Sequence, residues 1–349
     1  MRVLVTGATG LIGSELMDRL RRRSAPSGQG VGPGAGTLVG VARREGGPGP
    51  GTVRWDMATE PAPEALRGEW DVIVHAAADT RWTQSIPEAE RANVATVAAL
   101  TPLVSERTRL VHVSTAYALG RRGDTASGDP ADYRNHYEWS KAAAERLACD
   151  LFPGLTIVRP SLVIGRRGDG TAARFSGMYL FLRGVTAGTI PAVVGSPEAY
   201  LDVVPVDAVA GVIADRVLEA GAGGGDVLTV AAGAAAPRVQ EGLEAMVGAL
   251  NRWREERSLP AIEQPPLVAP ERWERFFLPF ARTHLSPRQM RILDLLANFA
   301  PYLQIDEPLR PTDPVADAAA AIAPAVRYWA DTHPRLAALE PRPWGEAIR

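Results

Sequence analysis

The chain has 349 residues, of which 46% are hydrophobic and 22% charged, so it can bury a sizeable core in one large domain or two unequal lobes. Its formal net charge of -2, without long basic runs, excludes the overall electrostatic footprint of a nucleic-acid-binding protein. A single cysteine, Cys149, excludes an internal disulfide and a cysteine metal cluster, and its apolar neighbours predict simple packing.

We expect no metal site, no membrane span and no leader peptide. No segment approaches ~18 uninterrupted apolar residues, and the first predicted strand begins at residue 2, which leaves no room for a leader. The basic cluster RLRRR at residues 19–23 is interpreted as the solvated end of the first helix, where cations suit the helix dipole. These features predict a cytoplasmic protein.

The chain opens with MRVLVTGATGLIGSEL, which predicts a strand, a tight glycine turn and a helix. Residues 3–5 have the β-branched character of a buried parallel strand. Gly7, Gly10 and Gly13 let a ligand approach the backbone, and a helix from about Leu11 presents unpaired N–H groups to an anion. The pattern is typical of a dinucleotide pyrophosphate site; the alternative is an ordinary turn of another α/β protein.

Strands alternate with helices along the first two thirds of the chain. A glycine-rich segment at residues 24–36 is interpreted as a flexible surface loop. Further strands are predicted at residues 37–44, 53–56, 71–78, 109–116, 155–161 and 226–233, with a helix at residues 209–218. From about residue 237, helical stretches interrupted by prolines show no clear strand.

This order predicts an α/β protein with a Rossmann-type doubly wound parallel sheet and a smaller, mainly helical C-terminal substrate lobe. Residues 1–164 are expected to form an NADP(H)-binding domain, to which residues 200–233 return. Residues 165–199 and 234–349 are expected to form the substrate-binding lobe.

The end of the second predicted strand, GVARRE, bears on the choice of cofactor. In this architecture the position faces the adenosine ribose, and an acidic residue there favours NAD. Here it carries Arg43 and Arg44, which can hold a 2′-phosphate, so the sequence predicts NADPH unless these arginines only face solvent. Asp56, which closes the third strand, could accept a hydrogen bond from the adenine amino group or cap a turn.

The stretch HYEWSK places Tyr137 and Lys141 on one face of a predicted helix. An ammonium beside a phenol is expected to lower the phenol's pKa from about 10 toward a range useful for proton transfer. Ser114 and Thr115 close the preceding strand, at the sheet edge where open α/β proteins bind ligands. Together these residues predict a hydroxyl, a phenol and an ammonium beside a dinucleotide site.

Five motifs in order resemble an extended short-chain dehydrogenase/reductase: TGATGLIG, HAAA, VSTAYALG, YEWSKAAAERL and VRPSLVIG. Within that superfamily, VHVSTAY, GRRGDGTAARFSGMY and LDVVPVDAVA are most similar to the fatty acyl-CoA reductase and thioester reductase group, also called the male sterility, NAD-binding group. The resemblance is strong to about residue 235 and weaker beyond it. The glycine-rich insertion and the absence of an adenylation or carrier domain depart from the family, so the substrate would come from elsewhere.

The resemblance implies that Thr115, Tyr137 and Lys141 are the catalytic residues. The implied cofactor-binding residues are Thr6, Gly7, Thr9, Gly10, Leu11, Ile12, Gly13, Arg43, Arg44, Asp56, Met57, Ala76, Ala77, Ala78, Lys141, Pro160, Ser161 and Val163. Substrate contacts are expected from Ser114, Tyr117, Arg166 and Arg167, although solvated loop arginines are an alternative interpretation.

The implied function is NADPH-dependent reduction of an acyl thioester, carried on CoA or a carrier protein, to an aldehyde and further to an alcohol if a second hydride follows. Such a reaction belongs to lipid or secondary metabolite biosynthesis. The alternatives are an extended reductase acting on a free aldehyde or ketone, a nucleotide-sugar epimerase, and a non-catalytic NADP(H)-binding sensor or scaffold. The sequence leaves the acyl group and the oligomeric state open.

Two further sets of residues have open roles. The apolar residues Trp273, Phe276, Phe277, Met290, Ile292 and Leu295 either line an acyl pocket or form the core of the helical lobe. Asn93 is interpreted as an active-site or structural polar contact, and His75 as placed by packing near the cofactor.

Overall fold

The computed structural model describes residues 1–24, 37–44, 51–219 and 225–341. Almost all of the segment predicted as a glycine-rich loop lies outside the described residues. The chain divides into two compact units, which are described in turn. Unit 1 comprises Met1–Ser161, Val206–Val230 and Pro311–Pro314, and unit 2 comprises the remaining segments.

Unit 1 is built on an eight-stranded sheet with the order β12-β10-β6-β5-β4-β1-β2-β3. Its strands are β1 (Arg2–Thr6), β2 (Thr37–Ala42), β3 (Thr52–Arg54), β4 (Val72–His75), β5 (Arg109–Val113), β6 (Leu155–Pro160), β10 (Val227–Ala231) and β12 (Asp313–Pro314). Neighbouring strands from β3 to β10 pair in parallel. The strand order reverses between β1 and β4, and open α/β sheets bind ligands at the carboxyl ends of strands at such a point. The predicted fold class is confirmed.

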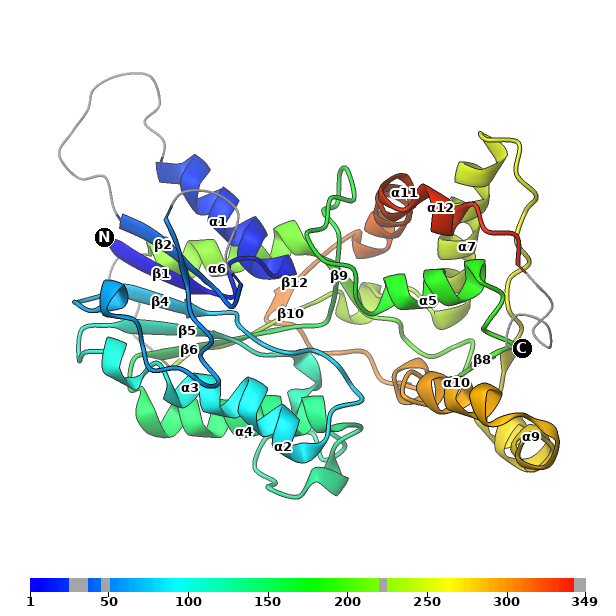
Figure 1. Ribbon diagram of the computed structural model, residues 1–349, viewed down its shortest axis with the longest axis horizontal. Coiled ribbons are helices and arrows are strands. Elements are labelled where there is room, and N and C mark those ends of the chain that lie inside the picture. Colours follow the sequence, from blue (N-terminus) through cyan, green and yellow to red (C-terminus); the bar gives the residue numbers. More distant parts are fainter. Residues whose placement is uncertain (25–36, 45–50, 220–224, 342–349) are drawn as a thin grey trace. The chain divides into compact units, whose positions relative to one another are not determined.

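Helices cover both faces of this sheet (Figure 1). Helices α1 (Leu11–Ser24) and α6 (Val206–Leu218) pack together on one face. On the other face lie α2 (Ile86–Ala89), a π-helical turn (Glu90–Val94), α3 (Ala95–Ala98) and α4 (His136–Leu151). The apolar positions of α1 point inward as predicted, because Leu16 and Leu20 are buried while Arg21, Arg22 and Arg23 lie in its last turn.

Unit 2 is mainly helical, with two small parallel pairs of strands. One pair joins β7 (Leu162–Ile164) to β9 (Val203–Pro205), and the other joins β8 (Val193–Val194) to β11 (Leu267–Val268). Its helices are α5 (Met178–Thr186), α7 (Val239–Glu255), α8 (Pro270–Arg272), a π-helical turn (Trp273–Phe277), α9 (Leu278–His284), α10 (Pro287–Ala297), α11 (Ile322–Thr332) and α12 (Pro334–Ala337). Helix α11 packs against α7.

Short 3₁₀ turns connect these elements at Glu64–Leu66, Thr101–Leu103, Ala116–Leu119, Pro130–Asp132, Gly233–Ala235, Ala300–Leu303 and Ala318–Ala321. The prediction of no strand after residue 237 was wrong at β11 and β12. Each has only two residues, which is too short for a periodic pattern to show.

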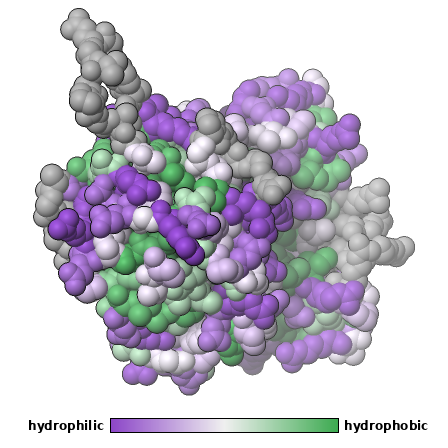
Figure 2. All heavy atoms as spheres, turned by 60° about the vertical axis from the view of Figure 1, so that its left-hand side comes forward, coloured by the Kyte–Doolittle hydropathy of each residue, from purple (hydrophilic) through white to green (hydrophobic). Residues whose placement is uncertain are grey.

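The surface shows two further features. Cys149 is exposed in the last turn of α4, which corrects the prediction that it packs inside. The preceding residue, Ala148, is fully covered, whereas Cys149 lies on the solvent side of the helix. Among the described residues no helix is long and apolar enough to cross a membrane. Figure 2 shows a face on which hydrophilic residues predominate and hydrophobic areas are small and interrupted.

A buried ion pair holds α4 against the sheet. The Arg159 Nε atom on β6 donates to a carboxylate oxygen of Glu145 on α4 at 2.9 Å, and Glu145 is 1% exposed. Because a second guanidinium nitrogen contacts the other carboxylate oxygen, the pair is bidentate. We expect Glu145→Ala to lower the free energy of unfolding by about 3 to 5 kcal/mol, since it leaves a largely buried guanidinium without its partner.

Urea denaturation of Glu145→Ala measures this loss. Glu219→Ala is the matched control because Glu219 pairs with Arg216 on the surface, where its side chain is 51% exposed. That variant should lose less than about 1 kcal/mol. Equal small losses in both variants would show that the buried pair does not hold α4.

Candidate active site

The glycine turn after β1 has no room for side chains. Gly7 has a φ of +68°, and a Cβ there would lie 2.6 Å from the Ala76 carbonyl oxygen. A Cβ on Gly13 would lie 2.1 Å from the Gly7 carbonyl oxygen, and the Gly10 N–H donates to that same oxygen at 2.8 Å. The turn therefore lies directly against the chain that follows β4. Thr9, Leu11 and Ile12 are partly exposed around it, where α1 begins with unpaired N–H groups.

The ends of β1 and β4 are tied together by a buried hydrogen-bond cluster. The Thr6 hydroxyl and His75 Nδ1 are 2.8 Å apart, and the Ala77 N–H donates to the same hydroxyl oxygen at 3.3 Å. Ala76 and Ala77 are partly exposed, and Ala78 is exposed. The predicted cofactor residues of these two strands thus meet at the point where the strand order reverses.

Arg43 and Arg44 are exposed just past β2. Arg43 lies close enough to Asp79 to help lower the pKa of that carboxyl: burial alone would raise it, but the ion pair with Arg81 and the Arg43 charge outweigh burial. The carboxylate of Asp56 accepts from the Ala58 N–H at 3.2 Å and so caps a turn after β3. Met57, next to it, is buried.

Helix α4 begins at a well-defined cap. The Asn135 side chain accepts from the Glu138 N–H at 3.0 Å, and the fully buried Glu138 carboxylate accepts from the Arg134 N–H at 3.0 Å. This start places Tyr137 and Lys141 one turn apart on the same face. Lys141 Nζ donates to the Val113 carbonyl oxygen at 2.9 Å and lies 3.3 Å from His112 Nε2. Burial lowers the pKa of Lys141 to about 8.

The Thr115 side chain lies close enough to the Tyr137 phenol to act to lower its pKa. Burial and the neighbouring Glu138 charge nevertheless raise the pKa of Tyr137 above its ordinary value. The expectation that Lys141 lowers this pKa is therefore not met in the structure. The reason is that the Lys141 ammonium is held by acceptors on β5, and burial disfavours the phenolate.

Two buried hydroxyls at the same sheet edge lack hydrogen-bond partners. Among the described residues, neither Ser114 Oγ after β5 nor Ser161 Oγ after β6 has one. Both were predicted as site residues. Thr115 Oγ1 lies 3.5 Å from the carbonyl oxygen of Pro160, which precedes Ser161. Because an unpaired buried hydroxyl is costly, these two oxygens fit a site that a polar ligand completes.

Three predicted residues belong to unit 2. Val163 lies in β7, and Arg166 and Arg167 follow it in a turn where the Arg166 N–H donates to the Thr171 carbonyl oxygen at 3.0 Å. Arg166 is half-buried and Arg167 exposed. Tyr117, in unit 1, lies in the 3₁₀ turn after Thr115 and is partly exposed.

Five of the six apolar residues predicted to form either an acyl pocket or a core fall into two groups. Trp273 is buried and stacks on Phe277 with ring centroids 4.1 Å apart, in a cluster that includes Met290. Phe276 is 65% exposed and Leu295 53% exposed, so these two do not belong to the core. The core interpretation holds for the first group only.

Asn93 and Ser140 form a contact that the sequence did not reveal. Asn93 lies in the π-helical turn, accepts from the Asp79 N–H at 2.8 Å and donates to Ser140 Oγ on α4 at 2.8 Å. It therefore joins the segment after β4 to the turn of α4 that lies between Tyr137 and Lys141. A single sequence carries no signal for a π-helical turn, which is a common feature of functional sites.

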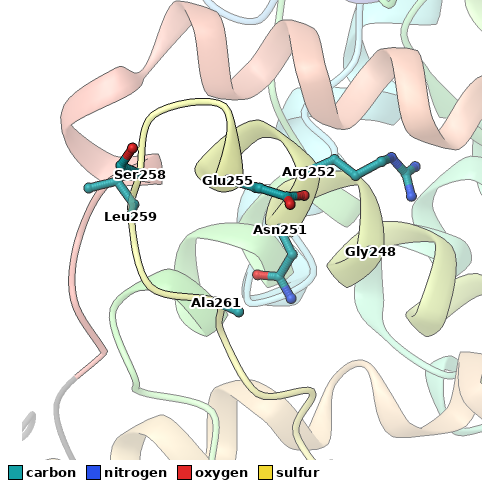
Figure 3. A pocket seen from close by; sticks show the side chains of 7 residues that line it. All are labelled: Gly248, Asn251, Arg252, Glu255, Ser258, Leu259 and Ala261. Carbon is teal, nitrogen blue, oxygen red and sulfur yellow. The ribbon is translucent and has the colours of Figure 1, made fainter.

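A cavity of about 390 Å³ lies at the end of α7 in unit 2. Figure 3 shows Asn251, Arg252 and Glu255 on the helix and Ser258, Leu259 and Ala261 on the loop that follows. None of the predicted residues lines it. The Asn251 side chain accepts a hydrogen bond from the Ile262 N–H at 2.8 Å and donates one to the Ile262 carbonyl oxygen at 2.9 Å, so both ends of its amide are paired. Among the described residues, no group of three His, Cys, Asp or Glu side chains could hold a metal ion.

Part of the chain matches a known protein family. Residues 59–213, a span that includes Thr115, Tyr137 and Lys141, match the family described as male sterility protein. Over 233 residues, or 62% of this chain, the sequence is 26% identical to the hybrid PKS-NRPS synthetase pvhA of Talaromyces variabilis. The match covers only 6% of that synthetase.

Solved structures establish the fold. The terminal R domain from the myxalamid PKS-NRPS biosynthetic pathway matches with a TM-score of 0.64 and 20% identity, over 97% of this chain and 92% of that domain. The UDP-glucuronic acid 4-epimerase from Bacillus cereus, in complex with NAD, matches with a TM-score of 0.57 and 16% identity, over 95% of this chain and 97% of the epimerase.

The fold, the glycine turn and these matches agree with the extended short-chain dehydrogenase/reductase type that the sequence motifs resemble. The match of residues 59–213 to the male sterility proteins agrees with the resemblance seen in the sequence over that part of the chain.

Gly13→Ala tests the turn as a cofactor site. Its methyl group would meet the Gly7 carbonyl oxygen at 2.1 Å, so the turn must shift, at a cost of about 1 to 3 kcal/mol in the free energy of unfolding. Because the shifted turn would no longer match the pyrophosphate, we expect NADPH affinity, measured by fluorescence titration, to fall at least about tenfold, which is a loss of about 1.4 kcal/mol in binding free energy. Gly128→Ala is the control, because a Cβ there meets nothing within 4 Å. Equal affinities in the two variants would contradict the assignment.

Proposed function

We propose that this chain reduces acyl thioesters with NADPH, using Thr115, Tyr137 and Lys141. The observation that carries the proposal is their arrangement in unit 1. The Thr115 side chain at the end of β5 lies close enough to the phenol to act on its pKa, and the ammonium lies one helical turn away against the same strand. A non-catalytic binding module would have no need of this set.

The residues present fit a dinucleotide. The turn of Gly7, Gly10 and Gly13 is closed to side chains but borders the start of α1, which suits a pyrophosphate. Arg43 and Arg44 are exposed at the end of β2, where a 2′-phosphate would be recognised, which supports NADPH. The unpaired Ser161 hydroxyl is available to the same ligand. When bound, NADPH supplies the hydride.

The protein's own contribution is positioning and proton transfer. Thr115 and Tyr137 donate hydrogen bonds to the thioester oxygen on which negative charge develops, each worth about 3 kcal/mol in such a site. Tyr137, kept protonated by its raised pKa, gives its proton to that oxygen. Lys141, one helical turn from the phenol, binds ribose hydroxyls of the cofactor. The resulting hemithioacetal loses its thiol to leave an aldehyde.

The substrate class rests on the relatives. The matched synthetase and the R domain both belong to PKS-NRPS systems, which supports a thioester on a carrier protein, with CoA as the other carrier. Ser114, Tyr117, Arg166 and Arg167 are proposed to contact it. A free aldehyde or ketone, or a nucleotide sugar, is the competing substrate class, and the epimerase shares the fold.

The deciding experiment is NADPH oxidation at 340 nm with acyl-CoA and acyl-pantetheine thioesters, free aldehydes and ketones, and nucleotide sugars, with products identified by mass spectrometry. The proposal expects oxidation with thioesters and release of free thiol, together with aldehyde or alcohol. Turnover confined to free carbonyls or nucleotide sugars would contradict the thioester assignment. If none of these compounds were turned over, a non-catalytic sensor or scaffold would be favoured.

Tyr137→Phe removes the proposed proton donor and keeps the ring. We expect kcat to fall at least about a hundredfold, with the NADPH dissociation constant changed less than about threefold. Tyr133→Phe is the control, since Tyr133 is buried in the same unit but its hydroxyl bonds to the Ser127 carbonyl oxygen. An unchanged kcat in Tyr137→Phe would refute the assignment.

Arg43→Asp tests cofactor choice. Replacing the guanidinium with a carboxylate should weaken NADPH binding at least about tenfold, with a much smaller effect on NADH, which lacks the 2′-phosphate. Arg54→Ala is a control, because Arg54 on β3 pairs with Glu60 in the turn that follows, whereas Arg43 is exposed just past the end of β2. An equal loss of affinity for NADPH and NADH would show that Arg43 does not recognise the 2′-phosphate.

A further inference from the structure

The chain has 38 lysine and arginine residues in total, and Lys141 is the one lysine among them. An arginine stays charged under all ordinary conditions and presents a broad planar fork, whereas a lysine is compact and its pKa shifts readily on burial. The position therefore calls for an ammonium in particular, and the groups that hold this ammonium determine its charge.

Lys141 is 1% exposed, so protein atoms must replace its water shell. Consecutive residues of β5 supply two acceptors: the Val113 carbonyl oxygen at 2.9 Å and His112 Nε2 at 3.3 Å. His112 itself is 0% exposed. Because an ammonium only donates, Nε2 must present its lone pair, which places the ring proton on Nδ1.

The His112 ring is kept neutral, and since Nδ1 has no hydrogen-bond partner among the described residues, the contact of Nε2 with Lys141 is the polar contact that orients it. Burial, the Lys141 charge and His75 hold the pKa of His112 well below its ordinary value. His75 on β4 stacks on His112, with ring centroids 5.4 Å apart and an interplanar angle of 23°. His75 is in turn fixed by its hydrogen bond with Thr6. A row of buried side chains across three strands thus leads to the ammonium.

We propose that His112 is a positioning residue, whose neutral imidazole Nε2 holds the Lys141 ammonium in place and in its charged form. Its effect on catalysis rests on the proposed function, whereas the hydrogen bond itself does not. At pH values above the Lys141 pKa the ammonium becomes neutral, so loss of His112 should move the decline of NADPH affinity to lower pH.

Other groups also act on this charge. Glu145, one turn further along α4, raises the pKa of Lys141, and it is paired with Arg159 on β6. His75 faces the ammonium from β4 and remains neutral, since burial and the Lys141 charge lower its pKa to about 3. Tyr137 lies one turn before Lys141 on α4. A substitution at His112 leaves all of these groups in place.

The single lysine makes the test direct. Protein labelled with ¹³C-lysine gives one lysine spin system, and its Cε shift against pH reports the Lys141 pKa without assignment. In His112→Leu we expect the pKa to fall to about 7 or lower, because the lost hydrogen bond to a charged donor corresponds to about tenfold or more in the protonation equilibrium. The amide oxygen of Gln can reach the Nε2 position, so in His112→Gln the protonation constant of Lys141 should return to within about threefold of its value in the unchanged protein.

Val111→Ala, on the same strand but with no acceptor in its side chain, controls for core destabilisation and should leave the Lys141 pKa unchanged. The same variants, titrated with NADPH from pH 6 to 9, should show the decline in affinity moving with the lysine pKa. An unchanged Lys141 pKa in His112→Leu, or an equal fall in Val111→Ala, would overturn the proposal.

A second measurement is made on the unchanged protein, so its result does not depend on whether a variant folds. Long-range ¹H–¹⁵N correlation of the unchanged protein should show a buried histidine with protonated Nδ1 and unprotonated Nε2, assigned with His112→Gln. A protonated His112 Nε2 would place two donors face to face and would overturn the proposal. Because neither spectrum depends on turnover, failure to reduce thioesters would reject the proposed function without affecting this test.

Discussion

A charged group with almost no access to water must find acceptors nearby, and strand β5 offers them to Lys141 through Val113 and His112. This contact fixes the rotation of α4, because a helix turned by one residue would take the ammonium away from the strand. Tyr137, one turn earlier, is thereby placed against Thr115. The Glu145–Arg159 pair fixes the following turn to β6, so α4 is held at successive turns.

The regular part of the fold could be predicted from the sequence because its strands are runs of β-branched residues bounded by glycine or polar residues. The strands from β1 to β6 and β10 were found within a few residues of their ends. Strand β12 could not be found, because Asp313–Pro314 has no pattern of its own. It joins β10 through backbone and side-chain bonds between Thr312 and Thr229, which lie far apart in the sequence.

The site was predictable in its residue types and less so in its electrostatics. Spacing alone puts Tyr137 and Lys141 on one helix face, but it does not predict which acceptors the Lys141 ammonium bonds to. The acceptors that hold it belong to β5, and the carboxylate that raises the phenol's pKa is Glu138, the next residue on the helix. Burial of Lys141 and the π-helical turn at Asn93 arise from tertiary packing, which one sequence does not encode in a local pattern.

The raised pKa of Tyr137 suits the proton-donor role that the proposed reduction gives to this phenol. An epimerisation that begins by oxidising an alcohol needs a base, so a phenolate must be available before the first step. A reduction needs the opposite, a phenol that still holds its proton when charge develops on the substrate oxygen. Burial and Glu138 favour the protonated phenol, and the nearby Thr115 side chain only partly offsets them. Because His112 and Val113 keep the ammonium on β5, the lysine charge does not reverse this preference.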